Sequence, residues 1–333
     1  WQAVLMDQLG SNELEMILGL TKKSDEEVEV PDCLMAVSPN EISSDWNFEK
    51  QPFMDSFVNL NWSGTPNILS KNHVLWSEID EVSQNTRKPF TETYPNFNFE
   101  AGSLSKLISD DFFSLRKAIH QRRSAVAMDG QTTMKRDTFY QFLIKTIPEA
   151  CPLPFQTLPW EPNVHLGLFV HRVDELPGGL YFLVRNKKHI EDLKSRLKPD
   201  FLWEKPEGCP AELDLFFLEQ GNFMETSASV SCGQDIAGQG CFSLGMISAF
   251  EEPLKKQGSW FYPRLYWECG AIGQILYLQA EVSGIRSTGI GCFFDDPVHQ
   301  VFGIQDMSYQ SLYHFTVGGP VEDTRLTTLP AYA

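Results

Sequence analysis

The first residues whose types could bind a ligand are Arg122, Arg123 and Ser124, which stand in succession. They end a segment, residues 103–122, in which apolar residues recur at helical spacing. Two guanidinium groups and a hydroxyl at the end of a helix can make charge-assisted, fork-shaped contacts to a phosphate. The alternative interpretation is that both arginines are ordinary surface residues, and the local pattern is compatible with either.

A second candidate is the glycine pair in Ser287–Phe294, where Gly289 and Gly291 flank Ile290. Glycine lets a backbone approach a flat ligand and present its N–H groups. The preceding segment, 264–284, has apolar residues at helical spacing and few charges, which predicts a helix buried on several sides. Its small residues predict close packing against another helix. The simpler interpretation is a buried helix, a glycine turn and a short strand.

The elements that would position these residues follow from periodicity along the rest of the chain. Helical spacing is found at residues 1–20 (with a second short helix from Ser11), 74–82, 103–122, 137–147, 188–197, 227–238, 264–284 and 298–304. Strand patterns are found at residues 164–170, 180–184, 214–218, 241–250 and 313–317. Helices and strands therefore alternate, which predicts a layered α+β or α/β fold.

Composition excludes several classes of function. The formal net charge is −17, from 44 acidic and 27 basic residues, so neither nucleic acid nor an anionic membrane surface is an expected partner. The 7 histidines and 7 cysteines show no metal-ligand spacing, and no metal is expected. The odd number of cysteines, with no C-x-x-C pair, favours free thiols in a reducing cytoplasm over a disulfide framework. No apolar run is long enough for a membrane span, and nothing resembles a signal peptide.

Four sequence motifs occur together and in a characteristic order. They are Arg122-Arg123-Ser124 after a helix, Leu176–Tyr181 (LPGGLY), Glu268–Gln274 (ECGAIGQ) continuing to Gly291, and Val317–Pro320 (VGGP) before Arg325. This series, covering about residues 103–330, resembles the nitroreductase-like flavoproteins. It is most similar to their SagB-type branch, which is related to azoline-oxidising dehydrogenases.

The resemblance implies an α+β nitroreductase-like fold, in which helices flank a central, mostly antiparallel sheet. It also implies FMN bound at a dimer interface. By the family pattern Arg122 and Ser124 would hold the FMN phosphate and ribityl chain, with Arg123 as a helper. Arg325 would also reach the phosphate, and Gly289, Ile290 and Gly291 would lie along the isoalloxazine ring. FAD is not expected, because the chain has no G-x-G-x-x-G fingerprint.

The sequence departs from the family in two places. Many relatives have a basic residue two positions after the serine, where this chain has Val126. The azoline-oxidising enzymes carry a Lys-Tyr pair before the long helix, where this chain has Lys255-Lys256-Gln257. Azoline oxidation is therefore not supported. Tyr262 and Tyr266 are weak candidates for a general acid or base, so no catalytic residue is assigned.

Three regions are expected along the chain. Residues 1–37 resemble the end of a preceding nitroreductase-like unit, and residues 38–102 read as a connector whose many aromatic rings bind it to a surface. Residues 103–333 form the expected FMN-binding domain. Because the chain begins at Trp1, inside a patterned segment, we expect the native polypeptide to extend further and to carry tandem units.

Two functions from different classes remain open. The first is a cytoplasmic FMN-dependent oxidoreductase that transfers hydride in a ping-pong cycle, with NAD(P)H as a possible electron donor and a small molecule or a peptide as substrate. The second is a degenerate, non-catalytic scaffold or peptide-binding unit of the same fold. In both cases the buried helix at 264–284 predicts a homodimer, or a pairing with a preceding tandem unit.

Overall fold

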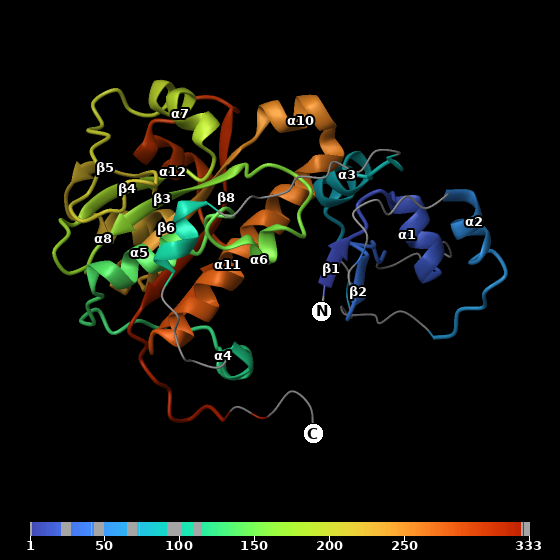
Figure 1. Cartoon of the computed structure of the whole chain (residues 1–333), viewed down its shortest axis with the longest axis horizontal. Coiled ribbons are helices and arrows are strands. Elements are labelled where there is room, and N and C mark those ends of the chain that lie inside the picture. Colours follow the sequence, from blue (N-terminus) through green and yellow to red (C-terminus); the bar gives the residue numbers. More distant parts are fainter. Residues whose placement is uncertain are drawn as a thin grey trace. The chain divides into compact units, whose positions relative to one another are not determined.

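The computed structural model describes residues 2–20, 28–40, 42, 50–64, 72, 74–91, 102–108, 115–327 and 329 (Figure 1). The chain divides into two compact units. The smaller unit consists of Trp1–Asn98, Gln156–Glu161 and Pro253–Arg264, and the larger of Phe99–Phe155, Pro162–Glu252 and Leu265–Ala333. The segments on either side of residue 37 therefore belong to one unit. That residues 1–37 come from a preceding tandem unit stays a prediction.

The smaller unit contains a two-stranded antiparallel sheet and short helices. Its elements are β1 Gln2–Leu5, α1 Ser11–Leu18, β2 Met35–Ser38, α2 Lys50–Asp55, α3 Ser77–Asn85 and the 3-10 helix η3 Ser259–Phe261. The prediction of a helix at the start of the chain was wrong, because residues 2–5 pair with residues 35–38 as strands. The second predicted helix is confirmed: it begins at Ser11 and ends at Gly19, whose φ of 71° is the left-handed conformation of a glycine C-cap.

Buried charges hold this unit together. The Arg264 guanidinium lies 2.6 Å from the Asp7 carboxylate, and both side chains are less than a tenth exposed. The Lys88 ammonium lies 4.8 Å from the centre of the Trp260 ring, and burial lowers the pKa of Lys88 to about 8. These contacts join residues from the beginning of the chain to residues 253–264.

The larger unit is built on one six-stranded sheet. Its strands are β3 Val164–Val170, β4 Gly179–Leu183, β5 Leu215–Gln220, β6 Phe242–Ala249, β7 Arg286–Ile290 and β8 Tyr309–Gly318. They lie in the order β5-β4-β3-β6-β8-β7, and every neighbouring pair is antiparallel. The α+β fold class and the mostly antiparallel sheet predicted from the sequence are confirmed.

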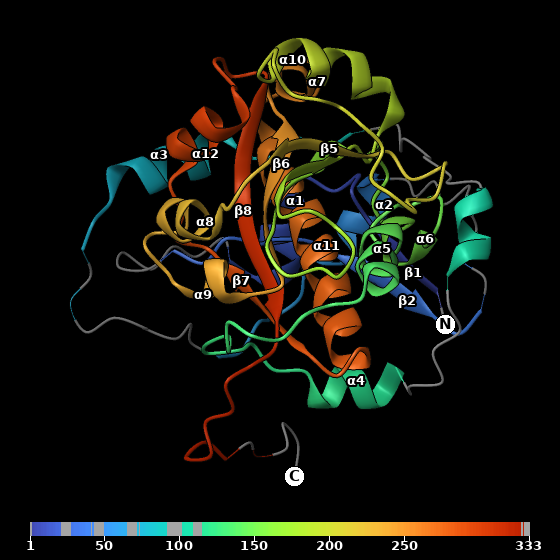
Figure 2. The same ribbon diagram turned by 90° about the vertical axis from the view of Figure 1, so that its left-hand side faces the viewer.

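Helices pack on both faces of this sheet. The helices of the remaining chain are η1 Ser103–Leu107, α4 Leu115–Gln121, α5 Arg136–Ile144, α6 Pro152–Phe155, η2 Lys187–His189, α7 Ile190–Arg196, α8 Met224–Val230, α9 Ile236–Gln239, α10 Glu251–Gln257, α11 Tyr262–Val282 and α12 Asp295–Phe302, and residues 253–257 of α10 and 262–264 of α11 belong to the smaller unit. On one face Phe139 and Phe142 of α5 contact Phe242, and α11 contacts β8 through Phe315. On the other face α7, α8 and α12 share a hydrophobic cluster with alternate residues of the strands. Figure 2 shows α8 and α12 on one side of β8 and α5 and α11 on the other.

The long helix α11 confirms the predicted segment, extending two residues further at its start. Gly284 follows its end with a φ of 69°, as expected of a helix stop. The expectation of close packing against another helix was wrong for Gly273, which faces the sheet. A Cβ at this position would lie 3.5 Å from the Phe315 ring. The small side chain thus brings α11 close to β8.

Two other predicted helices differ from the structure. The predicted helix at 103–122 is replaced by η1 and α4, and the residues between 108 and 115 lie outside the described part. The predicted helix at 227–238 is divided into α8 and α9 by a turn in which Cys232 and Gly233 have φ values of 56° and 69°. Two successive left-handed residues cannot continue a helix. The acidic residues 24–27 and the connector residues 43–49 and 92–101 also lie outside the described residues.

A buried ion pair anchors α11 to the sheet. Glu268 accepts hydrogen bonds from the backbone N–H groups of Asn163 and Val164, at 3.0 and 3.2 Å. It is paired with Arg185, whose side chain is fully buried. Arg185 also donates to the carbonyl oxygens of Thr146 and Val164, both at 2.8 Å. A charged pair in the core is tolerated because each partner has several hydrogen bonds.

Candidate functional site

The two sequence motifs expected to bind a ligand meet at the outer edge of strand β7, the last strand of the sheet. The inner edge of β7 pairs with β8, and the backbone groups of its outer edge need hydrogen-bond partners from another segment. That segment is the one after α4, in which the Ala125 N–H donates to the Ser287 carbonyl at 3.0 Å. The Thr288 hydroxyl donates to the Ala125 carbonyl at 2.6 Å. The structure therefore brings Ser124 beside the glycine-containing strand.

Tyr277 of α11 joins these segments. Its hydroxyl lies 2.8 Å from the Ser124 hydroxyl, and it accepts the Gly289 N–H, also at 2.8 Å. The guanidinium of Arg122 lies 4.9 Å from the centre of the Tyr277 ring, a cation–π distance. The ring also meets Phe315 edge-on, with centroids 4.9 Å apart. Residues separated by more than 150 positions thus form one polar cluster, which we call the Tyr277 cluster: Arg122, Ser124, Tyr277 and Gly289.

The fold places Tyr277 through Gly273, one helical turn earlier on α11. Because Gly273 has no side chain, the helix approaches β8 and Tyr277 packs on Phe315. Tyr277 belongs to none of the sequence motifs. The sequence signal for it is its spacing of four residues from a helical glycine, Gly273. Tyr262 and Tyr266, the tyrosines that the sequence suggested as an acid or base, stand at the start of the same helix, about four and three turns from Tyr277.

The two glycines have different surroundings. Gly289 lies within β7 and not in a loop, and a Cβ there would overlap the Tyr313 hydroxyl. Its N–H is already bonded to Tyr277, so the expectation of a bare N–H group at Gly289 was wrong. Gly291 is exposed beyond the end of the strand, and among the described residues its N–H has no hydrogen-bond partner. By the two-residue alternation of a strand it points to the same outer edge as the N–H of Gly289. The side chain of Ile290, between them, is buried.

The three arginines also differ in what they contact. Arg122 is half-buried, and no carboxylate pairs with it within the part of the chain that the structure describes. Arg123 donates to the carbonyl oxygens of His120 and Arg122, at 3.2 and 2.6 Å, and so caps the end of α4. Arg325 is 88% exposed and makes a two-bonded ion pair with Asp323. Among the described contacts none joins Arg325 to the Tyr277 cluster, so Arg122 is the cation that the structure places there.

The groups in this cluster can bind an anion and orient a ligand by hydrogen bonds. The Arg122 charge and the Ser124 hydroxyl suit a phosphate, and the free Gly291 N–H suits an acceptor atom. Burial, with the neighbouring Tyr277 as a smaller cause, raises the pKa of Tyr313, so its hydroxyl stays protonated at neutral pH. Over the described residues, no group of histidine, cysteine, aspartate and glutamate side chains is placed to hold a metal ion.

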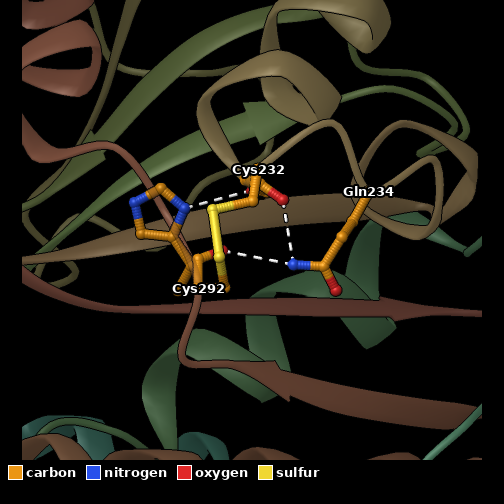
Figure 3. Close-up of a disulfide and its surroundings, with 5 residues drawn as sticks. Cys232, Gln234 and Cys292 are labelled. Atoms are coloured by element: carbon orange, nitrogen blue, oxygen red, sulfur yellow. Dashed lines mark hydrogen bonds between the residues drawn. A yellow bond between two sulfur atoms is a disulfide. The ribbon is translucent and has the colours of Figure 1, made fainter.

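A disulfide stands next to this site (Figure 3). Cys232, in the turn between α8 and α9, is joined to Cys292, the residue after Gly291. Their Cα atoms are 5.8 Å apart, and 60 positions separate them in the sequence. The other five cysteines are free. The sequence favoured free thiols over a disulfide framework, and this was wrong for this one pair, because neither residue belongs to a motif that spacing could reveal.

Comparison with known proteins gives similarity at the level of solved structures. Neither a protein-family model nor a curated protein sequence matches the chain. A protein from Anabaena variabilis assigned as a nitroreductase has 22% identity over 62% of this chain and 38% of its own length, with a TM-score of 0.48. The chain therefore spans well under half of that protein.

Two further similar structures have lower identity. The Escherichia coli microcin synthetase complex, solved with a truncated pro-microcin bound, shares 14% identity over 86% of this chain and 85% of the matched chain, with a TM-score of 0.45. An NADPH:FMN oxidoreductase from Vibrio harveyi, complexed with NAD⁺, shares 11% identity over 66% and 74% of the two chains, with a TM-score of 0.37. Identities and TM-scores this low do not transfer activity, cofactor or residue roles to this chain.

Within the described residues, no helix is both long and apolar enough to cross a membrane.

Proposed function

We propose that this chain binds FMN and acts as an oxidoreductase of the nitroreductase-like kind. The observation that supports the proposal is the Tyr277 cluster. Two motifs that were selected from the sequence for flavin binding lie against each other, although more than 150 residues separate them. A half-buried arginine without a carboxylate partner among the described residues is also unusual in a chain with a net charge of −17.

Each residue of the cluster has a distinct role in this proposal. Arg122 holds the FMN phosphate, and the Ser124 hydroxyl donates to a phosphate or ribityl oxygen. The Gly291 N–H, in place of that of Gly289, donates to an acceptor of the isoalloxazine ring. Tyr277 positions Ser124 and the β7 backbone and does not itself contact the cofactor. Bound FMN supplies hydride transfer, while these residues hold and orient it.

The residues around the cluster fit a flavin, but few of their positive charges are available to the FMN phosphate. Arg123 already donates to carbonyl groups of α4 through one of its guanidinium nitrogens, and Arg325 is paired with the Asp323 carboxylate. In this proposal Arg122, which no carboxylate neutralises among the described residues, supplies most of the attraction for the phosphate. A single charged fork with a hydroxyl provides a few charge-assisted hydrogen bonds of about 1.5–3 kcal/mol each. Such an interaction is consistent with reversible FMN binding.

The second candidate function is a flavin-free scaffold of the same fold. It is favoured by Val126, which is 72% exposed and carries no charge where many members of the resembling family have a basic residue. The pairing of Arg325 with Asp323 favours it as well. In this alternative the Tyr277 cluster would serve only to attach the segment after α4 to the sheet.

We further propose that the site is completed by a second unit, either another copy of the chain or a preceding tandem unit. Leu115 and Ile119 of α4 are 61% and 51% exposed, immediately before the arginine motif. Gly270 of α11 is also exposed, with no atom within 4 Å of a Cβ built on it. A second unit that covers these positions would bury well over ~2,000 Å², as obligate interfaces do. A SagB-type activity on a small molecule or a peptide, with NAD(P)H as donor, belongs to the same proposal.

The test is to identify the cofactor that the protein carries. Purified chain is denatured by heat, and the released small molecules are separated by chromatography and compared with FMN, FAD and riboflavin. We expect FMN, and we expect NADH or NADPH to bleach the flavin absorbance of the native protein. Recovery of FAD contradicts the assigned phosphate contacts. Apoprotein that takes up no flavin on reconstitution favours the scaffold.

A further inference from the structure

The disulfide between Cys232 and Cys292 lies where a solution reagent can reach it. Cys292 is exposed, and Cys232 is half-buried in the turn after α8. The pair connects that turn to the segment that follows Gly291, as Figure 3 shows. The proposed binding of FMN does not use either sulfur. Because Cys292 is the more exposed of the two residues, its sulfur is the one that we expect an attacking thiolate to meet first.

Non-covalent contacts hold the same two segments together on both sides of the disulfide. The Phe294 N–H donates to the Val230 carbonyl at 2.8 Å. The Gln234 side chain donates to the carbonyl oxygens of Ser231 and Cys292, at 2.9 and 3.2 Å (Figure 3). These bonds involve backbone atoms adjacent to both cysteines and do not depend on the sulfur–sulfur bond.

His314 of β8 contacts both segments and so adds a third connection between them. Its Nδ1 lies 3.1 Å from the Ser231 hydroxyl, and the Phe293 ring stacks on the imidazole with a centroid distance of 4.5 Å and an angle of 14°. Ser231 and Phe293 are the neighbours of Cys232 and Cys292. The two cysteines would therefore stay next to each other after the disulfide is reduced.

This arrangement determines which reductant can act. When a monothiol attacks Cys292, the Cys232 thiolate that leaves stays adjacent and expels the monothiol again, restoring the disulfide. A dithiol escapes this reversal, because its own second thiol attacks the mixed disulfide and closes a stable ring. High local concentration of the partner cysteine thus selects dithiols over monothiols.

We propose that Cys232 and Cys292 form a reversible thiol–disulfide exchange site whose reductant is a dithiol. A thiolate of the dithiol bonds to the Cys292 sulfur while the Cys232–Cys292 bond breaks, and Cys232 leaves and takes up a proton. The second thiol of the reductant then bonds to the first, which releases Cys292, and Cys292 takes up a proton. The two cysteines gain two electrons and two protons, and the dithiol becomes a cyclic disulfide. An oxidised dithiol reverses the sequence.

The experiment uses the full chain under native conditions, with peptide-level mass spectrometry after acid quenching and alkylation. Protein prepared without reductant is treated with dithiothreitol, or with a mixture of reduced and oxidised glutathione at equal total thiol. We expect dithiothreitol to expose both thiols at least about tenfold faster than glutathione does. We expect oxidised dithiothreitol to restore the bond. Cys33, which is free and exposed, reports in the same sample that glutathione reacts with a free thiol.

A Cys232→Ser variant provides the matched control. It removes the neighbour that expels a monothiol, so its Cys292 should accumulate the glutathione adduct that the wild-type Cys292 does not. Equal adduct at Cys292 in both proteins overturns the proposal. The proposal is also overturned if dithiothreitol cleaves the disulfide only in denaturant. It is overturned as well if both cysteines are recovered as free thiols after treatment with oxidised dithiothreitol. None of these results depends on whether flavin is bound.

Discussion

Replacing Tyr277 by phenylalanine removes one oxygen atom from the centre of the Tyr277 cluster. The hydroxyl makes two hydrogen bonds of 2.8 Å, to the Ser124 hydroxyl and from the Gly289 N–H. Each is worth about 0.5–1.5 kcal/mol net. Ser124 is exposed, so water can replace its bond, whereas the Gly289 N–H faces a half-buried site. We therefore expect Tyr277→Phe to lower the free energy of unfolding by about 1–2 kcal/mol.

A Tyr277→Leu variant separates the hydroxyl from the ring. Phenylalanine keeps the cation–π contact with Arg122 and the edge-on contact with Phe315, and leucine loses both. Those contacts contribute about 0.5–1 and 0.5–1.5 kcal/mol, so leucine should cost a further ~1–2 kcal/mol. Urea unfolding monitored by circular dichroism measures both differences, at an unchanged dependence on urea concentration.

A double-mutant cycle with Ser124→Ala then isolates the Tyr277–Ser124 bond. We expect a coupling free energy of about 0.5–1 kcal/mol between the two hydroxyls. Two results together would refute the conclusion that Tyr277 joins the two motifs. They are a coupling free energy near zero between Tyr277 and Ser124, and a free energy of unfolding that is the same in Tyr277→Phe as in the wild type. The exposed Tyr266, changed to phenylalanine on the same helix, is the control for loss of a hydroxyl elsewhere.

Three further results are expected. Glu268→Gln should cost about 3–5 kcal/mol in urea unfolding, because it leaves the buried Arg185 guanidinium without a counter-charge, and a cost under 1 kcal/mol contradicts this. Burial lowers the pKa of His314 to about 4, so the unfolded chain takes up this proton first as pH falls below about 6.5. Stability should drop by ~3 kcal/mol from this residue between about pH 6.5 and pH 4, and His314→Asn should remove that part of the slope. In light scattering, Gly270→Glu should dissociate the proposed assembly into folded single units, whereas Gly273→Glu should unfold the protein against Phe315. Intact assembly in Gly270→Glu excludes an interface at that face.

The sequence predicted the sheet strands and α11 well, since their patterns are local. Each strand of the larger unit was predicted, although β7 only as a short strand beside a glycine turn, and the Leu176–Tyr181 motif indicated the hairpin of β3 and β4. The start of the chain was misassigned because Gln2–Leu5 is stabilised by pairing with Met35–Ser38, about 30 residues away. Such pairing overrides a weak helical period over four residues.

The candidate site was predicted only in part, for a related reason. Motif order indicated Arg122, Ser124 and the glycine strand, and these do lie together. Motif order does not identify Tyr277, the residue that joins these two segments. Tyr277 acts through its position on the face of α11 that packs on Phe315. The disulfide was missed likewise, since a turn after α8 and the end of β7 become neighbours only through the sheet. The roles of Arg123 and Arg325 toward a cofactor stay predictions.

The proposed function depends on FMN binding, which can be measured by titrating the flavin-free chain with FMN and following the quenching of flavin fluorescence. We expect saturable binding, which Arg122→Ala weakens by about 2–4 kcal/mol, a factor of roughly 30 to 1,000, because the phosphate loses its charged fork. Arg123→Ala is the matched control and should change affinity by less than about threefold, since its guanidinium caps α4. Affinity that is unchanged in Arg122→Ala, or no binding of FMN by the wild-type chain, contradicts the proposed FMN site.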